Sequence, residues 1–244
     1  MKGLRLDERL VRDGLADSRT RAQALIRAGQ VLVDDTPHDK PGTRVRDDAE
    51  VRVRGEAKRF ASRGGEKLAG ALDDLAFDVV GRACLDVGAS TGGFTDCLLQ
   101  RGARSVVAVD VGYGQLDARL RSDPRVHVRD RTNARHLEPE ALPEPVSLVT
   151  ADVSFISLRL VLPALARCAP DAEWLLLVKP QFEVGPEQVG KGGVVRDDAL
   201  RAQAADAVAS SAVALGFAEV GRSESRVAGP AGNREIFVLL RPRG

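Results

Sequence analysis

The chain has 244 residues, of which 43% are hydrophobic and 29% charged, and its formal net charge is +1. This composition suits a folded protein with room for one mid-sized domain and a small one, and it excludes a wholly disordered, collagen-like or coiled-coil chain. No apolar run reaches the roughly 18 residues of a membrane-spanning helix. The first ten residues are charged where a signal peptide would be apolar. We therefore expect a cytoplasmic protein without a membrane span.

Cysteine and histidine are scarce in this sequence. An odd number of cysteines, none of them in a C-x-x-C pair, argues against a disulfide framework and against a zinc site. The histidines are too scattered to suggest a metal cage or a Ser/His/Asp triad. We expect no metal site, so any catalysis must rest on lysine and carboxylate side chains. The residues concerned are Cys84, Cys97, Cys168, His38, His127 and His136.

A short helix is predicted close to the N-terminus. Leu6, Leu10 and Val11 recur at helical spacing. Asp7 is a possible cap for this helix, and Gly14 is placed to end it.

A second helix and a small sheet are predicted to follow. Ser18 is expected to cap the helix and Gly29 to end it. Residues 31–33 and 45–53 then alternate like strands, separated by an Asp/Pro/Gly-rich turn at 34–42.

Residues 5–33 (RLDERLVRDGLADSRTRAQALIRAGQVLV) resemble the small S4-like RNA-binding domain at nearly every apolar position and at both glycines. The resemblance implies an α+β RNA-binding domain over residues 1–58. Residues 1–67 carry 16 basic and 12 acidic side chains, a balance that fits a polyanionic partner. Arginines on an exposed helix face suit phosphate binding, although such a face can also serve solvation alone. The predicted RNA-binding residues here are Arg5, Arg19, Arg21 and Arg27.

Residues 59–66 are expected to be a linker, beyond which strands and helices alternate over residues 67–244. This alternation is typical of an α/β, doubly wound fold with a mostly parallel sheet. Pro163 must lie in the first turn of its helix or kink it, because it has no N–H to donate. The expected strands are residues 83–87, 105–111, 126–129, 146–151, 174–178, 218–227 and 236–241, with helices at 95–100 and 198–215.

A glycine-rich turn follows the first of these strands, where backbone amides can approach a ligand at a helix N-terminus. Phe94 stands where a nucleotide-triphosphate loop needs Lys-Ser/Thr, and the spacing is not G-x-G-x-x-G. An acid after the second strand, Asp110, can accept both ribose hydroxyls. The pattern resembles the S-adenosylmethionine loop of Rossmann-like class I methyltransferases, although ligand-free turns of this kind exist. The resemblance implies that fold, with a mostly parallel seven-stranded sheet. The predicted cofactor-binding residues are Asp86, Gly88, Ser90, Thr91, Gly92, Gly93, Phe94, Asp110, Val111, Thr132 and Asn133.

Four charged residues are predicted to meet at the carboxyl edge of the sheet. They are Lys67, Asp152, Lys179 and Glu235. In this order they resemble the tetrad of ribose 2′-O-methyltransferases. A lysine held among carboxylates can orient a ribose hydroxyl and stabilise the developing alkoxide, or accept its proton. We assign that central role to Lys179, although each of the four could instead belong to an ordinary surface ion pair.

The fourth strand is followed by Asp152-Val-Ser-Phe155. Amino-group methylation of bases normally shows a D/N-P-P-Y/F turn at this point, so the sequence favours hydroxyl methylation.

Several long runs resemble the TlyA family, historically called haemolysins. They include S-R-G-G-E-K-L from Ser62, C-L-D-V-G-A-S-T-G-G-F-T from Cys84 and V-K-P-Q-F-E-V-G from Val178. The resemblance implies methylation of cytidine 2′-hydroxyls in ribosomal RNA or ribosomal subunits. This chain stops at Gly244, without the tail of the dual-subunit members, which favours the large subunit.

A glycine-rich loop at residues 184–196 is expected to approach the target ribose. Lys191 and Arg196 in this loop are predicted to contact RNA, although the loop could equally be a mobile connection with solvated charges. Two other functions compete with methylation: a noncatalytic RNA-binding or ribosome-assembly protein with a vestigial methyltransferase fold, and a membrane-active haemolysin. The intact glycine turn and tetrad argue against the first, and the absence of an apolar span argues against the second.

Overall fold

The computed structural model of the chain describes residues 3–54, 59–229 and 231–243. The chain divides into two compact units, Met1–Lys58 and Arg59–Gly244. Each unit has its own hydrophobic core.

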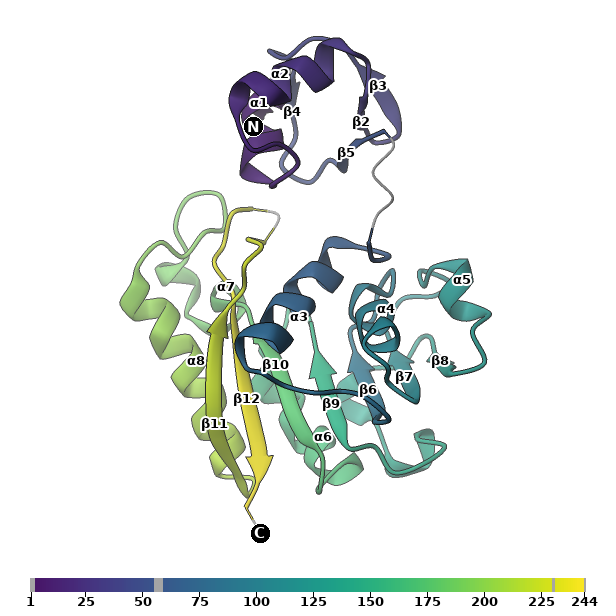
Figure 1. The fold of residues 1–244 in the computed structure, drawn as a ribbon. Helices are drawn as coiled ribbons and strands as arrows, with labels where there is room; N and C mark the ends of the chain where they lie inside the picture. The colour runs from purple at the N-terminus through teal and green to yellow at the C-terminus, as the bar shows by residue number, and fades with distance from the viewer. Residues whose placement is uncertain (1–2, 55–58, 230, 244) are drawn as a thin grey trace. The chain divides into compact units, whose positions relative to one another are not determined.

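The first unit packs two short helices on small antiparallel sheets (Figure 1). Ser18 caps the second helix by accepting a hydrogen bond from the backbone N–H of Arg21, as predicted. Gly14 and Gly29, just beyond the helix ends, adopt left-handed backbone angles of +71° and +66°, which glycine adopts at little cost. The elements are β1 (Leu4–Arg5), α1 (Leu6–Arg12), α2 (Arg19–Arg27), β2 (Val31–Val33), β3 (Thr36–His38), β4 (Arg44–Val45) and β5 (Val51–Val53).

Three predictions for this unit are wrong. Asp7 does not cap α1 but lies inside it with a fully buried side chain. The predicted turn at 34–42 contains β3, because Asp34 and Asp35 both take positive φ angles and close a two-residue hairpin between β2 and β3. The predicted strand at 45–53 is also interrupted, since β4 pairs with β1 whereas β5 pairs with β2.

The described part of the second unit contains a seven-stranded, mostly parallel sheet, and this confirms the predicted fold. Its strand order is β11-β12-β10-β9-β6-β7-β8, with β12 antiparallel to both of its neighbours. The strands are β6 (Ala83–Val87), β7 (Ser105–Val109), β8 (Val126–Arg129), β9 (Leu148–Ala151), β10 (Glu173–Val178), β11 (Phe217–Glu224) and β12 (Ile236–Pro242).

Helices cover both faces of this sheet (Figure 1). On one face α3 (Arg63–Asp74) and α4 (Gly93–Gln100) bury their leucines. On the other face α6 (Leu162–Cys168) buries its leucines, and α8 (Asp198–Val213) buries mainly alanines and Val208. The shorter α5 (Ala118–Arg121) and α7 (Pro180–Glu183) follow β7 and β10. Pro163 lies in the first turn of α6, as predicted.

The expected linker at 59–66 is wrong in its second half, because α3 begins at Arg63. The Ser62 hydroxyl accepts a hydrogen bond from the backbone N–H of Gly64, and this caps the helix. Phe60 is 3% exposed and packs in the core of the second unit. These residues therefore belong to the folded unit. Residues 55–58, the last of the predicted S4-like domain, lie outside the described residues.

Candidate active site

The carboxyl ends of three neighbouring parallel strands meet at one edge of the sheet. β6 leads to Gly88, β9 to Asp152 and β10 to Lys179. β12 lies beside β10 but runs the opposite way, so the residue before its first, Glu235, lies at the same edge. The topology therefore collects residues that are far apart in the chain, as the strand pattern predicted.

Lysine and carboxylate side chains pair at this edge. Lys179 Nζ lies 2.5 Å from a carboxylate oxygen of Asp152 and donates a hydrogen bond to Ser154 Oγ at 2.8 Å. Lys67 Nζ, on α3, lies 2.6 Å from Glu235 Oε2. The structure thus resolves which lysine meets which carboxylate, a question that the sequence left open.

The two pairs differ in depth. The Lys67 and Glu235 side chains are 8% and 1% exposed, whereas those of Lys179 and Asp152 are 11% and 20% exposed. The second oxygen of Glu235, Oε1, is buried and accepts no hydrogen bond from the described residues. Lys179 and Asp152 are therefore the more accessible pair, and Lys67 and Glu235 are the more deeply buried one.

A cavity of about 280 Å³ opens beside these pairs, close to the lower end of the sizes usual for small-molecule sites, roughly 300 Å³. It combines the glycine turn after β6, the start of α3 and the ends of β9 and β10. Its lining is Ser62, Arg63, Gly64, Lys67, Gly88, Ala89, Ser90, Thr91, Gly93, Phe94, Asp152, Ser154 and Lys179.

Two glycines of the turn lie too close to neighbouring segments to carry side chains. Gly88 has a φ of +84°, and a Cβ there would lie 2.5 Å from the carbonyl oxygen of Asp152. A Cβ on Gly93 would lie 2.2 Å from Ser62 Oγ. Glycine at these positions therefore lets the wall of the cavity touch both the catalytic strand and the start of α3.

Asp86 was predicted to bind the cofactor, but the structure places it away from the cavity. Its side chain is fully buried and does not line the cavity. It accepts hydrogen bonds from Thr95 Oγ1 at 2.7 Å and from Thr150 Oγ1 at 3.3 Å, which join α4 and β9 to β6. Burial raises the pKa of Asp86 to about 7, and the Asp152 carboxylate adds to the rise, whereas the bond from Thr95 opposes it. The sequence located this acid correctly but could not show that it lies beneath the turn.

The residues predicted to bind the cofactor beyond the glycine turn do not line the cavity. Asp110 accepts hydrogen bonds from the backbone N–H groups of Ser90 and Gly112, at 2.8 and 2.7 Å. Val111 is 71% exposed. Thr132 and Asn133 hydrogen-bond within their own loop. Asp110 therefore touches the glycine turn, whereas Val111, Thr132 and Asn133 have no contact with the cavity.

Comparison with known proteins identifies the chain. Residues 60–242 match the FtsJ-like methyltransferase family, and residues 4–51 match the S4 domain. The 16S/23S rRNA (cytidine-2′-O)-methyltransferase TlyA of Mycobacterium tuberculosis is 56% identical over 97% of this chain and 89% of its own length. The chain belongs to the TlyA family of FtsJ-like methyltransferases.

Two further relatives match nearly the whole chain. Hemolysin A of Brachyspira hyodysenteriae is 40% identical over 96% of this chain and 98% of its own length. A solved structure from Streptococcus thermophilus, described as a candidate hemolysin, is 41% identical, covers 100% of this chain and 90% of its own, and has a TM-score of 0.79. The predicted membership of the TlyA family is thereby confirmed.

Sequence reasoning missed part of this TlyA-family cavity. Ser62, Arg63 and Gly64 line it, although they were expected to belong to a flexible linker. Their run S-R-G-G-E-K-L was noticed only as a mark of family resemblance, and a serine before a helix is a capping signal that could have revealed them. Ser154, the hydrogen-bond partner of Lys179, was also missed.

The loop after β9 carries an unusual aromatic residue. Phe155 is 87% exposed, has a positive φ of 66° and contacts the ring of Phe182 at 5.4 Å between centroids. Glu183 fixes this loop, since it accepts hydrogen bonds from Ser157 Oγ at 2.6 Å and from the Leu158 N–H at 2.7 Å. Burial raises the pKa of Glu183, although these two bonds oppose the rise. An exposed, fixed aromatic ring thus lies one residue beyond Ser154.

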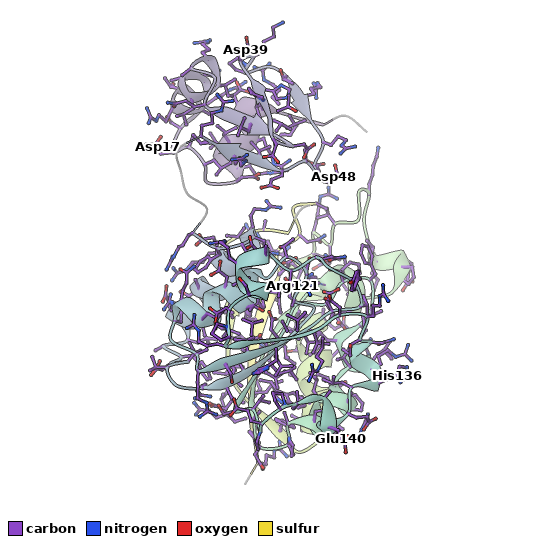
Figure 2. All side chains as sticks on the ribbon, turned by 90° about the vertical axis from the view of Figure 1, so that its right-hand side faces the viewer. Asp17, Asp39, Asp48, Arg121, His136 and Glu140 are labelled. Carbon is purple, nitrogen blue, oxygen red and sulfur yellow. The ribbon has the colours of Figure 1, made fainter. Side chains whose placement is uncertain are left out.

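The predicted RNA-binding arginines of the first unit fall into two groups. Arg5 and Arg19 both pair with the buried Asp7, at 3.0 Å each. Burial opposes ionisation of Asp7, but hydrogen bonds from Arg5, Gln23 and Arg19 outweigh it and hold its pKa well below the ordinary range. Asp7 therefore holds two guanidinium groups in place, whereas other acids of this unit lie at its periphery. Figure 2 shows Asp17, Asp39 and Asp48 there.

The other predicted RNA contacts are solvent-exposed. Arg21 and Arg27 lie on the exposed face of α2. Lys191 and Arg196 are exposed in the loop beyond α7, which a bridge between Gly190 and Val194 folds into a hairpin. Among the residues that the structure describes, no helix is long and apolar enough to cross a membrane, and no cluster of three or more His, Cys, Asp or Glu side chains could hold a metal ion.

Proposed function

We propose that the chain transfers a methyl group from S-adenosylmethionine to the 2′-hydroxyl of a cytidine in ribosomal RNA. The observation that carries the proposal is the Lys179–Asp152 pair, hydrogen-bonded to Ser154 at the rim of the cavity beside the glycine turn. The names of the TlyA relatives, given above, support the choice of reaction and of substrate.

The cavity fits S-adenosylmethionine by the chemistry of its walls. Gly88 and Gly93 allow a ligand to approach the backbone, and Ser90 and Thr91 add hydroxyl groups. Lys67 and Lys179 are each paired with a carboxylate, so a sulfonium cation would not face an uncompensated ammonium group. We assign cofactor binding to residues 88–94 of the turn, with Asp110 fixing the turn from outside through Ser90.

S-adenosylmethionine, when bound, supplies an electrophilic methyl group on a positively charged sulfur. The protein must present a ribose hydroxyl as the nucleophile and stabilise the negative charge that develops on its oxygen. In our proposal Lys179 Nζ hydrogen-bonds this oxygen, and Asp152 and Ser154 hold the lysine in position. The hydroxyl proton passes to Lys179 Nζ as Lys179 gives one of its own protons to the Asp152 carboxylate, so the lysine keeps its charge beside the oxygen.

Lys67 and Glu235 act as the rear wall of the site in this proposal. Their pair joins α3 to the start of β12. A buried ion pair is costly to break by removing one partner, because the remaining charge stays buried without compensation. Their role is to keep the two elements together and to set the electrostatic environment of Lys179.

Phe155 is placed to contact the target base. A ribose hydroxyl that reaches Lys179 must belong to a nucleotide drawn out of its stack, and an exposed ring can replace the lost stacking. We propose that the cytidine base packs on Phe155, which Phe182 supports from the side.

The substrate is proposed to be ribosomal RNA, bound through the S4 domain as well as the catalytic domain. Arg21 and Arg27, together with Arg5 and Arg19 on Asp7, would track the phosphate backbone. The Mycobacterium tuberculosis relative is named for both 16S and 23S RNA. Both subunits therefore belong in the test.

The first prediction concerns the central lysine. Purified protein is incubated with labelled S-adenosylmethionine and deproteinised 16S or 23S RNA, or with assembled subunits, and the methylated nucleotide is identified by mass spectrometry. We expect the wild type to methylate a cytidine 2′-hydroxyl and Lys179→Ala to lose roughly 100- to 10,000-fold in rate, since a positioned proton-transfer group contributes about that much. Cofactor affinity, measured by calorimetry, should change little.

Lys40→Ala provides the matched control, since this lysine is exposed in a loop and lines no part of the cavity. Full activity in Lys179→Ala would contradict the proposed chemistry. RNA binding without any methyl transfer by the wild type would favour the noncatalytic RNA-binding alternative, and lysis of erythrocytes without methyl transfer would favour the haemolysin.

A further inference from the structure

A second hollow in the catalytic unit shares no residue with the proposed active site. Its volume is about 450 Å³, and two segments form its walls: residues 194–201, which lead into α8, and residues 231–234, which lead into β12. The lining is Val194, Val195, Arg196, Asp198, Arg201, Ala231, Gly232 and Arg234.

One buried amide ties these two walls together. Asn233 is 2% exposed, and its Oδ1 accepts a hydrogen bond from the Val195 N–H at 2.9 Å. Its Nδ2 donates to the carbonyl oxygen of Gly193 at 2.8 Å. Both ends of this side chain are therefore satisfied by the opposite wall, and the hollow is a built feature of the fold.

The hollow carries an excess of positive charge, with three arginines against one carboxylate. Arg201 is 8% exposed. Its guanidinium group forms an ion pair with Asp198 and donates a hydrogen bond to the carbonyl oxygen of Arg196. Arg196 and Arg234 are exposed, and neither forms an ion pair within residues 3–54, 59–229 and 231–243. Two guanidinium groups thus remain available on facing walls.

We propose that this hollow binds one backbone phosphate of the substrate RNA. Guanidinium groups match phosphate oxygens in charge and in planar geometry, and phosphate contacts fix the register of a bound nucleic acid. Arg234 directly precedes Glu235, whose carboxylate meets Lys67 in the wall of the active site. A phosphate held here would therefore fix the RNA strand relative to the reacting ribose. This inference rests on the proposed function, since it assumes an RNA substrate.

Arg196→Gln, Arg234→Gln and the double variant test it in the full-length protein. The probe is deproteinised ribosomal RNA, with affinity measured by filter binding between 50 and 200 mM salt. We expect the double variant to bind roughly tenfold more weakly and to lose about one unit of slope in the plot of log affinity against log salt, as for one lost phosphate contact. The KM for RNA should rise while kcat at saturating RNA is retained.

Arg167→Gln is the matched control. This exposed arginine lies in the last turn of α6, which leads to the start of β10, at the edge of the sheet opposite the hollow. Arg196→Lys with Arg234→Lys keeps the charge, so this variant should keep the salt slope while losing some affinity. Asn233→Ala should weaken RNA binding like the arginine variants while cofactor binding is unchanged.

An unchanged affinity and salt slope in the double glutamine variant would overturn the phosphate site even if the wild type methylates RNA normally. A reduced slope in a protein that transfers no methyl group would support the phosphate site and instead refute the proposed function.

Discussion

Gly88, in the proposed cofactor turn, lies against the backbone of Asp152 at the end of β9. Its positive φ and its distance from the Asp152 carbonyl leave no room for a side chain. Any residue with a Cβ must strain its backbone by about 1–2 kcal/mol in this conformation and must also push Asp152 away from its place. The position of Lys179 depends on Asp152, so a change in the turn should reach the reacting groups.

Gly88→Ala is therefore expected to impair cofactor binding and catalysis together. We predict at least tenfold weaker binding of S-adenosylmethionine, measured by calorimetry, because the turn must move. Gly81→Ala is a matched control: Gly81 also has a positive φ, of +71°, but a Cβ there meets nothing within 4 Å. Equal effects of the two substitutions would show that backbone strain alone is responsible and that the contact with Asp152 is irrelevant.

Asp86 predicts a pH dependence of stability. Its pKa is raised by burial to about 7 in the folded protein, whereas an exposed aspartate titrates near 4. The folded state thus binds the proton more tightly, so this contribution is fully present below pH 4 and is lost as the pH rises toward 7 and beyond.

Asp86→Asn removes this titration while keeping an oxygen acceptor for Thr95. We expect urea denaturation to show that the wild type loses, relative to the variant, a few kcal/mol of unfolding free energy between pH 4 and pH 8. Parallel curves for the two proteins over this range would contradict the raised pKa. Glu187→Gln, at an exposed carboxylate, should leave the wild-type profile unchanged.

At the scale of elements, Glu183 couples two segments of the site. It is the last residue of α7, the short helix that begins directly after Lys179. Through Ser157 and Leu158 it also holds the loop that carries Asp152, Ser154 and Phe155. The lysine and the loop that orients it are therefore fixed to each other by one buried carboxylate.

Glu183→Gln has a single acceptor oxygen and cannot satisfy both donors. We expect the unfolding free energy to fall by about 1–2 kcal/mol, the usual cost of one unsatisfied buried group, and kcat to fall while the affinity for S-adenosylmethionine is unchanged. Thermal denaturation and methyl-transfer kinetics measure the two effects. An unaltered kcat in a destabilised protein would mean that Glu183 serves stability alone.

The strands around the site were predictable because their hydrophobic runs end in polar residues at the sheet edge. The run Leu175–Val178 before Lys179 is an example, and all four of its residues are fully buried. The ion-pair partners were not predictable, because the Lys67–Glu235 contact spans 168 residues and depends on the position of β12 in the sheet. Contacts of this kind are fixed by tertiary packing and leave no local pattern.

Other errors in the predicted structure arose where the backbone adopts a conformation that the residue types alone do not indicate. The Asp34–Asp35 pair reads as an ordinary polar turn, yet its two positive φ angles make a hairpin. Ser62–Gly65 reads as flexible because of its glycines, yet Gly65 is enclosed by Phe60: a Cβ there would lie 2.3 Å from that ring. Glycine in this segment reflects close packing rather than freedom of the chain.

At the scale of the whole molecule, the two units carry separable tasks. Every residue that lines the proposed active site lies in Arg59–Gly244, and the arginines on Asp7 and α2 lie in Met1–Lys58. Since Phe60 and Ser62 belong to the second unit, removal of the first 58 residues leaves the cavity lining intact.

A chain that begins at Arg59 is therefore expected to bind S-adenosylmethionine with the affinity of the full-length protein. Its affinity for ribosomal RNA should fall, with a shallower salt dependence, because the phosphate contacts of the S4 domain are lost. Calorimetry and filter binding separate the two outcomes. Loss of cofactor binding in a truncated protein that still melts cooperatively would show that the first unit helps to form the cavity.

The place of β12 between β10 and β11 has a consequence for biosynthesis. The strand enters the sheet last in chain order, and it brings with it the carboxylate that neutralises Lys67. During synthesis Lys67 therefore stays without this partner until the segment that forms β12 has left the exit tunnel. The earlier strands can form hydrogen bonds with one another before that point, but the buried charge of α3 is compensated only when β12 joins them.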